Sequence, residues 1–252
     1  MLSVVIPSYK DPLLQKTIDS LLENSELGDK MEIIAVLDGY WPSPQLRDDK
    51  RLKILHLGKN RGMRGAINAG VAISKGDYIM KSDAHCMFGK GYDRILLERI
   101  RDNWIVTPRR YFLDTEKWEV INNILPVDYK KLVIDQDKFA RQEWQSRAEE
   151  RKDKMIDDTM VIQESCWVMA RSWWDKVIRE LQTDDDGTIE IAMKTFVAGG
   201  RTMVNKNTWY AHKHRKFGRT SHVSGEEIKK GNDYVLSRWK DELVKMNQYF
   251  GI

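Results

Sequence analysis

The first hundred residues alternate between short β-rich apolar segments and segments whose apolar residues recur at helical spacing. Asp11 and Pro12 predict the N-cap and first residue of the first helix. Regular alternation of this kind favours a mainly parallel sheet with helices on both faces, which places the chain in the α/β class. The strand-like segments cover residues 3–7, 32–38, 52–57, 77–83 and 103–108, and the helical ones cover 13–22, 62–74 and 92–100.

Two aspartates lie where strand-like segments end. Asp38 ends the second segment and Asp83 ends the fourth. Ligands of open α/β sheets bind beyond the carboxyl ends of the strands, so both residues are expected near a ligand. His85 follows Asp83 by two residues, and side chains two apart project to the same side. The pair suits a divalent metal ion, and a surface turn with a polar residue at each corner is the alternative.

The alternation stops in the middle of the chain. We therefore divide the sequence into residues 1–110, an insertion at 111–160 and a second half at 161–252, and expect a single domain. The later part of the insertion mixes charges of both signs with few aliphatic residues, which is typical of an exposed helix or loop. Residues 201–212 have the alternating pattern of a strand, and residues 233–250 predict an amphipathic helix.

The composition is that of an ordinary soluble protein, with 41% hydrophobic and 32% charged residues. No apolar run approaches the roughly 18–20 residues of a membrane span. The N-terminus enters a strand-like segment without the features of a signal peptide, so we expect a cytoplasmic protein. Two cysteines, Cys86 and Cys166, do not make a disulfide framework and are predicted to be buried free thiols.

Basic residues are concentrated late in the chain. Between Glu190 and Glu226 there is no acidic residue and there are seven basic ones, more than the net charge of +4 of the whole chain. This indicates an anionic partner such as a nucleotide diphosphate, a nucleic acid or an acidic glycan, and a solvated face is the alternative. The seven residues are Lys194, Arg201, Lys206, Lys213, Arg215, Lys216 and Arg219.

Several motifs occur in an order that resembles a known enzyme family. SVVIPSYKDP, VLDGYW and NRGMRGAINAGVAISKGDYIMKSDAH are similar to the nucleotide-sugar domain of family-2-type glycosyltransferases with the GT-A fold. The Asp83-x-His85 variant is similar to the motif of the polypeptide N-acetylgalactosaminyltransferases. GTIEIAMKTFVAGG, YAHKHRK and SRWKDELVKMNQYF resemble later segments of those enzymes. The resemblance implies a Rossmann-like GT-A fold, in which residues 1–110 bind the nucleotide sugar and residues 161–252 form the acceptor side and a C-terminal helix.

The resemblance also implies a metal and a donor. His212 would join Asp83 and His85 as the third metal ligand, and this donor set suits Mn²⁺, with Mg²⁺ as the alternative. The donor would be a UDP-sugar. The residues implied at the donor are Pro7, Ser8 and Tyr9 around the base, Asp38 at the uracil or ribose, Arg61, Arg64 and Arg215 at the diphosphate, and Lys81 beside Asp83.

The catalytic base is less well indicated. Family members that invert the sugar's configuration usually carry an aspartate just before the substrate helix, and here that position falls on Thr188. Retaining relatives need no dedicated base, so the stereochemistry stays open. The candidate acids are Asp185 and Asp186 in a shifted loop, Glu190 at a matching position, and Glu164 in an otherwise apolar run.

These features predict a metal-dependent glycosyltransferase that moves a sugar from a UDP-sugar to an acceptor hydroxyl. The alternative is a GT-A domain that binds a nucleotide or polyanion without catalysis. The basic segment suggests DNA with hydroxymethylated bases as one acceptor, and a glycan or a protein side chain is an equal rival. The insertion adds aromatic residues that could approach such a polyanion, namely Trp118, Tyr129, Phe139 and Trp144.

Overall fold

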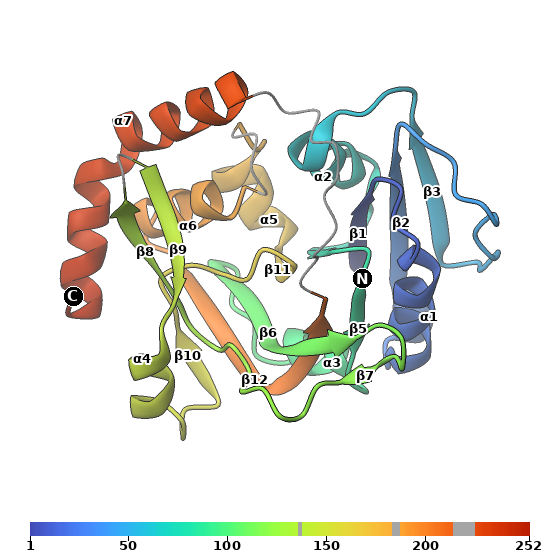
Figure 1. Ribbon diagram of the computed structural model, residues 1–252, viewed down its shortest axis with the longest axis horizontal. Helices are drawn as coiled ribbons and strands as arrows, with labels where there is room; N and C mark the ends of the chain where they lie inside the picture. The colour runs from blue at the N-terminus through green and yellow to red at the C-terminus, as the bar shows by residue number, and fades with distance from the viewer. Residues whose placement is uncertain (136–137, 183–186, 214–224) are drawn as a thin grey trace.

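A mixed ten-stranded sheet runs through the computed structural model, which describes residues 1–135, 138–182, 187–213 and 225–252 (Figure 1). Two short strands lie off the main path of this sheet: β5 (Cys86–Phe88) pairs with β12 (Arg201–His212), and β7 (Glu119–Val120) pairs with β6 (Trp104–Asp114). The main path runs in the order β10 (Ile156–Asp158), β12 (Arg201–His212), β6 (Trp104–Asp114), β11 (Cys166–Ala170), β4 (Tyr78–Ser82), β1 (Leu2–Ser8), β2 (Met31–Asp38) and β3 (Leu52–Leu57).

The N-terminal part of the sheet is parallel, as predicted. β1 pairs in parallel with both β2 and β4, and β3 pairs in parallel with β2. Every residue of β1 and β2 is buried, which is usual for parallel strands covered on both faces. One face packs on α1 (Leu14–Asn24) and α3 (Tyr92–Leu97), and the other packs on α2 (Gly62–Ile73). A short helical turn, η1 (Gly28–Lys30), leads into β2.

The small residues of α2 allow the close packing that the sequence predicts. A Cβ atom on Gly70 would lie 2.4 Å from Val5 Cγ1 and 2.9 Å from Val36 Cγ2. Both distances are shorter than any normal carbon–carbon contact. Gly70 therefore lets the helix lie directly on β1 and β2.

The second half of the chain continues the same sheet. β11 lies between β4 and β6 and is antiparallel to both, while β12 is parallel to β6. After β11 the chain forms α5 (Arg171–Trp173), the wide turn η2 (Trp174–Ile178) and α6 (Thr188–Val197), and it ends in α7 (Gly225–Phe250). Figure 1 shows α6, α7 and the paired strands β8 (Lys130–Asp135) and β9 (Lys138–Glu143) on the side of the molecule away from β1–β3. The fold is thus a mixed, mainly parallel sheet flanked by helices.

The insertion contains more regular structure than its charge pattern predicts. β6 continues to Asp114, past the expected boundary at 110. β8 (Lys130–Asp135) precedes the charged part, which forms β9 (Lys138–Glu143) and the short α4 (Gln145–Glu150). The expectation of an exposed helix or loop is wrong for β9, because Leu132 and Phe139 pack into a buried cluster with α6 and α7. The division of the chain at 110 and 160 stays a prediction.

Both cysteines are buried free thiols, as predicted, and burial raises the pKa of each. Among the described helices, none combines the length and the hydrophobicity that crossing a bilayer requires.

Candidate metal centre

The end of β12 carries His212 across to the end of β4. Asp83 follows β4 directly, and His85 precedes β5. β12 pairs antiparallel with β5, so His212 lies opposite Cys86, and the Lys213 N–H donates to the His85 carbonyl at 3.3 Å. Asp83 and His85 therefore meet through a turn after the strand, and the pairing of two strands far apart in sequence adds the third side chain.

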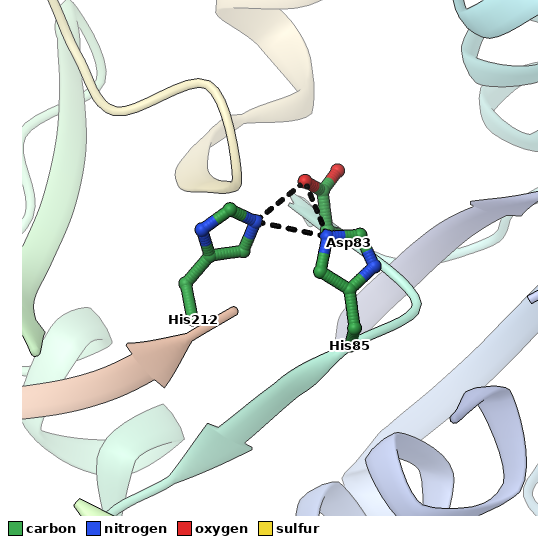
Figure 2. A group of neighbouring side chains, drawn as sticks. All are labelled: Asp83, His85 and His212. Atoms are coloured by element: carbon green, nitrogen blue, oxygen red, sulfur yellow. Dashed lines mark hydrogen bonds and ion pairs between the residues drawn. The ribbon is translucent and has the colours of Figure 1, made fainter. Parts of the chain in front are cut away.

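Three ligand atoms form a small triangle at this edge of the sheet (Figure 2). His212 Nε2 lies 3.1 Å from Asp83 Oδ2 and 3.0 Å from His85 Nε2, and the third side, from His85 Nε2 to Asp83 Oδ2, is 3.6 Å. Two ligands about 2.1 Å from one ion and at right angles to each other lie about 3 Å apart. The triangle therefore fits one face of the coordination sphere of a divalent ion and leaves other positions open.

The charges of two of these residues suit a cation. Burial lowers the pKa of His212 to about 4, although the hydrogen bond with Asp83 opposes this shift. Burial would raise the pKa of Asp83, but the Lys81 ammonium and the His212 hydrogen bond outweigh it and hold this pKa well below its usual range. At neutral pH the site thus offers a carboxylate and a neutral His212 imidazole, the forms that bind metals.

Lys81 supports Asp83 from inside the protein. Its side chain is 0% exposed, and its Nζ donates to Asp83 Oδ1 at 2.5 Å and to the Glu164 carbonyl at 2.5 Å. This position leaves no surface for the predicted contact with the donor. Lys81 instead orients and charge-balances the Asp83 carboxylate.

Asp38 caps a helix. Its Oδ1 accepts the Arg61 N–H at 2.7 Å and its Oδ2 accepts the Gly62 N–H at 3.0 Å, at the N-terminus of α2. The side chain is buried, and these contacts support a structural role for Asp38 at the end of the strand. A contact with uracil or ribose stays a prediction.

Other predicted donor residues lie beside Asp38. β1 and β2 pair so that Ser8 lies opposite Leu37, and the Ser8 hydroxyl is 2.5 Å from the hydroxyl of Tyr40. The Tyr9 ring meets the Tyr40 ring edge to face, with centroids 6.1 Å apart. Pro7 is buried in β1, Arg61 is exposed at the start of α2, and Arg64 donates from Nη1 to the Gln182 carbonyl.

The two candidate acids within the described residues are engaged in ion pairs. Glu164 Oε1 lies 2.7 Å from Lys130 Nζ and 2.9 Å from Arg141 Nε. Burial would raise the pKa of Glu164, but Arg141 and Lys130 outweigh it and lower the pKa to about 2, where a carboxylate is a poor general base.

Glu190 is fully buried and its carboxylate lies 2.6 Å from Lys194 Nζ, a position out of reach of an acceptor. It also accepts the Gln182 N–H at 2.7 Å. Asp185, Asp186 and Arg215 lie outside the described residues, so the catalytic roles of all four acids stay predictions.

The basic segment does not form the expected patch over its described residues. Lys194 Nζ donates to the Ile178 carbonyl, Lys206 is 5% exposed and donates to the Arg151 carbonyl, and the Arg201 guanidinium lies over the Tyr249 ring. These side chains stabilise the protein internally. Lys213 is half-buried and donates from Nζ to the Thr115 hydroxyl at 2.7 Å. Arg215, Lys216 and Arg219 lie outside the described residues.

The expectation that aromatic residues of the insertion approach a polyanionic acceptor is also partly wrong. Tyr129 is 1% exposed and Phe139 is 5% exposed, so neither can approach an acceptor. Trp118 and Trp144 are half-buried, and Trp144 meets the Phe250 ring. The Phe139 ring packs in a buried cluster with α6 and α7, and the Tyr129 hydroxyl donates to Asp157 Oδ2 at 3.0 Å.

Sequence reasoning missed three charged residues that surround the site. Asp11 was predicted only as a helix cap, yet its Oδ2 lies 3.0 Å from His85 Nδ1. Lys130 and Arg141 hold Glu164 from the β8–β9 hairpin. Asp11 lies 74 residues from its partner, so no local pattern could have indicated the contact.

Comparisons with known proteins agree with this architecture. A crystal structure of GalNAc-T7 with UDP, GalNAc and Mn²⁺ aligns with a TM-score of 0.77 and 17% identity over 96% of this chain and 49% of that one. A crystal structure of S. aureus TarS 1–349 in complex with UDP-GlcNAc aligns with a TM-score of 0.63 and 12% identity over 94% of this chain and 65% of that one. At such identities the likeness concerns the fold, and it confirms the expected GT-A architecture.

This chain spans about half the length of the GalNAc-T7 chain and about two thirds of the TarS chain. No curated protein sequence matches it. The family model described as glycosyl transferase family 2 matches residues 3–178, which is well over half of the 252 residues. The chain therefore belongs to glycosyl transferase family 2.

Proposed function

We propose that this protein transfers a sugar from a UDP-sugar to an acceptor hydroxyl with the help of a divalent metal ion, Mn²⁺ or Mg²⁺. The observation that carries the proposal is the triangle of Asp83 Oδ2, His85 Nε2 and His212 Nε2, with sides of 3.0–3.6 Å, at the ligand-binding edge of the sheet. Two proteins of the same fold support the choice of donor, since GalNAc-T7 was solved with UDP, GalNAc and Mn²⁺ and TarS with UDP-GlcNAc.

Asp83, His85 and His212 would hold the ion. When bound, the metal supplies Lewis-acid stabilisation of the charge that develops on the departing diphosphate. Asp83 is the single acidic side chain of the triad, and His212 is neutral at pH 7. Most of the ion's positive charge is therefore kept for the diphosphate.

The base-binding end of the site would lie at the ends of β1 and β2. Tyr9 offers an aromatic ring for the uracil, and the Ser8–Tyr40 hydroxyl pair closes the same edge. Asp38 fixes the start of α2, and this places Arg61 and Arg64 in the first turn of the helix, where a guanidinium can meet a phosphate.

Removal of the acceptor proton is assigned to Asp185 or Asp186. We prefer them to Glu164, which is held by two cations, and to Glu190, which is buried. Asp185→Asn and Asp186→Asn, made singly, separate the two. The true base variant should lose turnover by about 100-fold or more while the affinity for UDP is unchanged.

The activity is tested by UDP release. The protein is incubated with Mn²⁺ and each common UDP-sugar, with and without acceptor mixtures, and the same assays are run on His212→Ala. Metal-dependent UDP release that His212→Ala lacks supports the proposal. UDP binding without turnover for any donor and acceptor would favour the alternative, a GT-A domain that only binds a nucleotide. Neither binding nor release would overturn both.

The acceptor is proposed as a hydroxyl of a glycan or of a hydroxymethylated base in DNA. Mass spectrometry of products after donor screening distinguishes these classes directly. The salt dependence of acceptor binding gives a second test, because contacts with nucleic-acid phosphates make the affinity fall steeply with salt concentration. A flat salt dependence would exclude the DNA acceptor.

A further inference from the structure

Asp11 contacts both a helix terminus and the proposed metal centre. It lies between β1 and α1, its side chain is 0% exposed, and its Oδ1 accepts the Leu13 N–H at 3.0 Å. Its Oδ2 lies 3.0 Å from His85 Nδ1, in a contact that is also buried. The first contact is the local one that a residue before a helix commonly makes. The second contact reaches across the fold and has no role in the helix.

This second contact fixes which nitrogen of His85 carries the proton. A carboxylate can only accept hydrogen bonds, so His85 Nδ1 is the donor and carries the hydrogen. In the neutral ring the lone pair then lies on Nε2, which is the atom 3.0 Å from His212 Nε2 and 3.6 Å from Asp83 Oδ2. The ring is thereby held with its metal-binding nitrogen directed into the triangle.

We propose that Asp11 is a positioning residue of the metal centre, which holds His85 in the Nδ1–H tautomer with Nε2 directed at the ion. This inference rests on the proposed metal site. Carboxylates that accept the second N–H of a metal-binding histidine fix its tautomer and orientation, and their loss commonly costs 10–100-fold in metal affinity.

Lys81 acts similarly on Asp83, since its ammonium donates to Oδ1 and leaves Oδ2 directed at the two imidazoles. Buried charged side chains thus hold two of the three proposed ligands. The Lys81 ammonium pairs with Asp83, and the Asp11 carboxylate accepts a hydrogen bond from His85. Asp11 is the more useful of the two to test, because it can be changed to asparagine without a change of volume.

The decisive variant is Asp11→Asn. Because the Leu13 N–H needs an acceptor, the amide oxygen of the substituted side chain is expected to take it, which turns the amide NH₂ towards His85 Nδ1. His85 would then accept at Nδ1 and carry its proton on Nε2, the wrong atom for metal binding. Asp11→Ala removes both contacts and is the second variant.

Two readouts are measured on the full chain. The first is the affinity for Mn²⁺ alone, from the electron paramagnetic resonance signal of free Mn²⁺. We expect the Kd for Mn²⁺ to be 10–100-fold higher in both variants. The control Asp49→Ala loses a similar local contact, with the Arg51 N–H at 2.8 Å, and should bind Mn²⁺ as the wild type does.

The second readout is the imidazole ¹⁵N spectrum of the metal-free protein, with the His85 signals among those of five histidines assigned by their absence in His85→Gln. We expect a protonated Nδ1 in the wild type and a protonated Nε2 in Asp11→Asn. Wild-type Mn²⁺ affinity in both variants, or a wild-type His85 protonated on Nε2, overturns the inference. If the wild type binds no Mn²⁺, the metal site itself fails, whereas the tautomer measurement still decides whether Asp11 orients His85.

Discussion

The ends of β2 and β4, the two strands that flank β1, carry the same residue in different surroundings. Asp38 at the end of β2 directs both carboxylate oxygens at backbone N–H groups of α2. Asp83 at the end of β4 gives one oxygen to Lys81 and directs the other at two imidazoles. The strand end alone does not decide whether an aspartate is structural or binds a ligand. The role of the aspartate depends on which segment of the chain packs against it.

The arriving segments differ in what they offer. The chain after β3 brings the N-terminus of α2 to Asp38, where backbone donors need acceptors. At Asp83, the pairing of β12 with β5 brings an unprotonated imidazole, and burial keeps it neutral. Asp38 faces backbone N–H groups that can only donate hydrogen bonds, whereas Asp83 faces two imidazole rings, which are side chains that can also bind a cation.

The largest expected effect comes from removing His212, the side chain that β12 brings to the end of β4. His212→Ala should abolish measurable Mn²⁺ binding and lower transfer by about 1000-fold or more, since the proposed metal would supply several kcal/mol of transition-state stabilisation. The fold should persist because, unlike Asp83→Ala, this variant leaves the ammonium of Lys81 paired. Isothermal titration with Mn²⁺ and an assay of UDP release measure both quantities.

His56→Ala is the matched control for that variant. His56 lies on β3 and its ring stacks on Trp41, with centroids 4.2 Å apart. Its replacement should leave Mn²⁺ binding at the wild-type level. Mn²⁺ binding by His212→Ala with wild-type affinity would mean that the two strand ends do not differ in the proposed way.

Removing the Asp38 carboxylate at the end of β2 should lower the free energy of unfolding and leave the affinity for Mn²⁺ unchanged. Asp38→Ala leaves the N–H groups of Arg61 and Gly62 without their acceptor and should lower the free energy of unfolding by about 1–2 kcal/mol. Urea unfolding measures this change. Asp114→Ala removes a similar acceptor from an exposed turn and should cost less. A lower Mn²⁺ affinity of Asp38→Ala would contradict the proposed contrast between Asp38 and Asp83. A lower UDP affinity alone would support the predicted contact of Asp38 with the uracil or ribose.

The close approach of α2 to β2 can be tested separately. Gly70→Ala places a methyl group against Val5 and Val36 and should destabilise the protein by about 1–2 kcal/mol, despite the higher helix propensity of alanine. Thermal unfolding gives the measurement. Gly58→Ala, where a Cβ would meet nothing within 4 Å, is the control. An unchanged unfolding temperature would show that α2 does not need this contact to present its N-terminus to Asp38.

The smallest effect concerns the pH dependence next to β4. The folded-state pKa of Glu164 is about 2, below its ordinary value of 4.5, so its ion pairs stabilise the fold above about pH 4.5 and this contribution is lost as the pH falls to 2. Glu164→Gln should therefore lose stability relative to wild type at pH 6, and the difference should shrink as the pH falls towards 2. Urea unfolding at several pH values measures it.

Glu143→Gln provides the comparison for the pH series, since Glu143 pairs with Arg110 but is 43% exposed. Because solvent screens an exposed pair, Glu143→Gln should lose less stability at pH 6 than Glu164→Gln does. A constant difference between Glu164→Gln and wild type from pH 6 to pH 2 would contradict the lowered pKa.

Much of the fold was predictable because its signals are local. The buried runs of β1 and β2, the apolar face of α1 and the small residues of α2 each specify an element within about a dozen residues of sequence. The predicted strand at 201–212 and the helix at 233–250 were found for the same reason. The hairpin of β8 and β9 was missed, because its buried face exists only where α6 and α7 cover it.

The site was predictable in part, and the resemblance to a family supplied what local patterns could not. Asp83 and His85 stand out by their spacing, whereas His212 was implied by its flanking motif and lies 127 residues from His85. The basic run was misleading over its described part, because charge along the sequence does not reveal that Lys194 and Lys206 donate to backbone carbonyls inside the fold.

The sequence by itself determined the α/β class, the order of most elements and the side chains able to bind a metal, since periodicity and residue chemistry act over short distances. Only the tertiary structure decided which partners these side chains meet. In it, Asp38 contacts a helix terminus, Asp83 contacts Lys81 and His212, and Asp11 contacts His85. Those contacts join segments up to 129 residues apart, and they exist because strand pairing and packing bring the segments together.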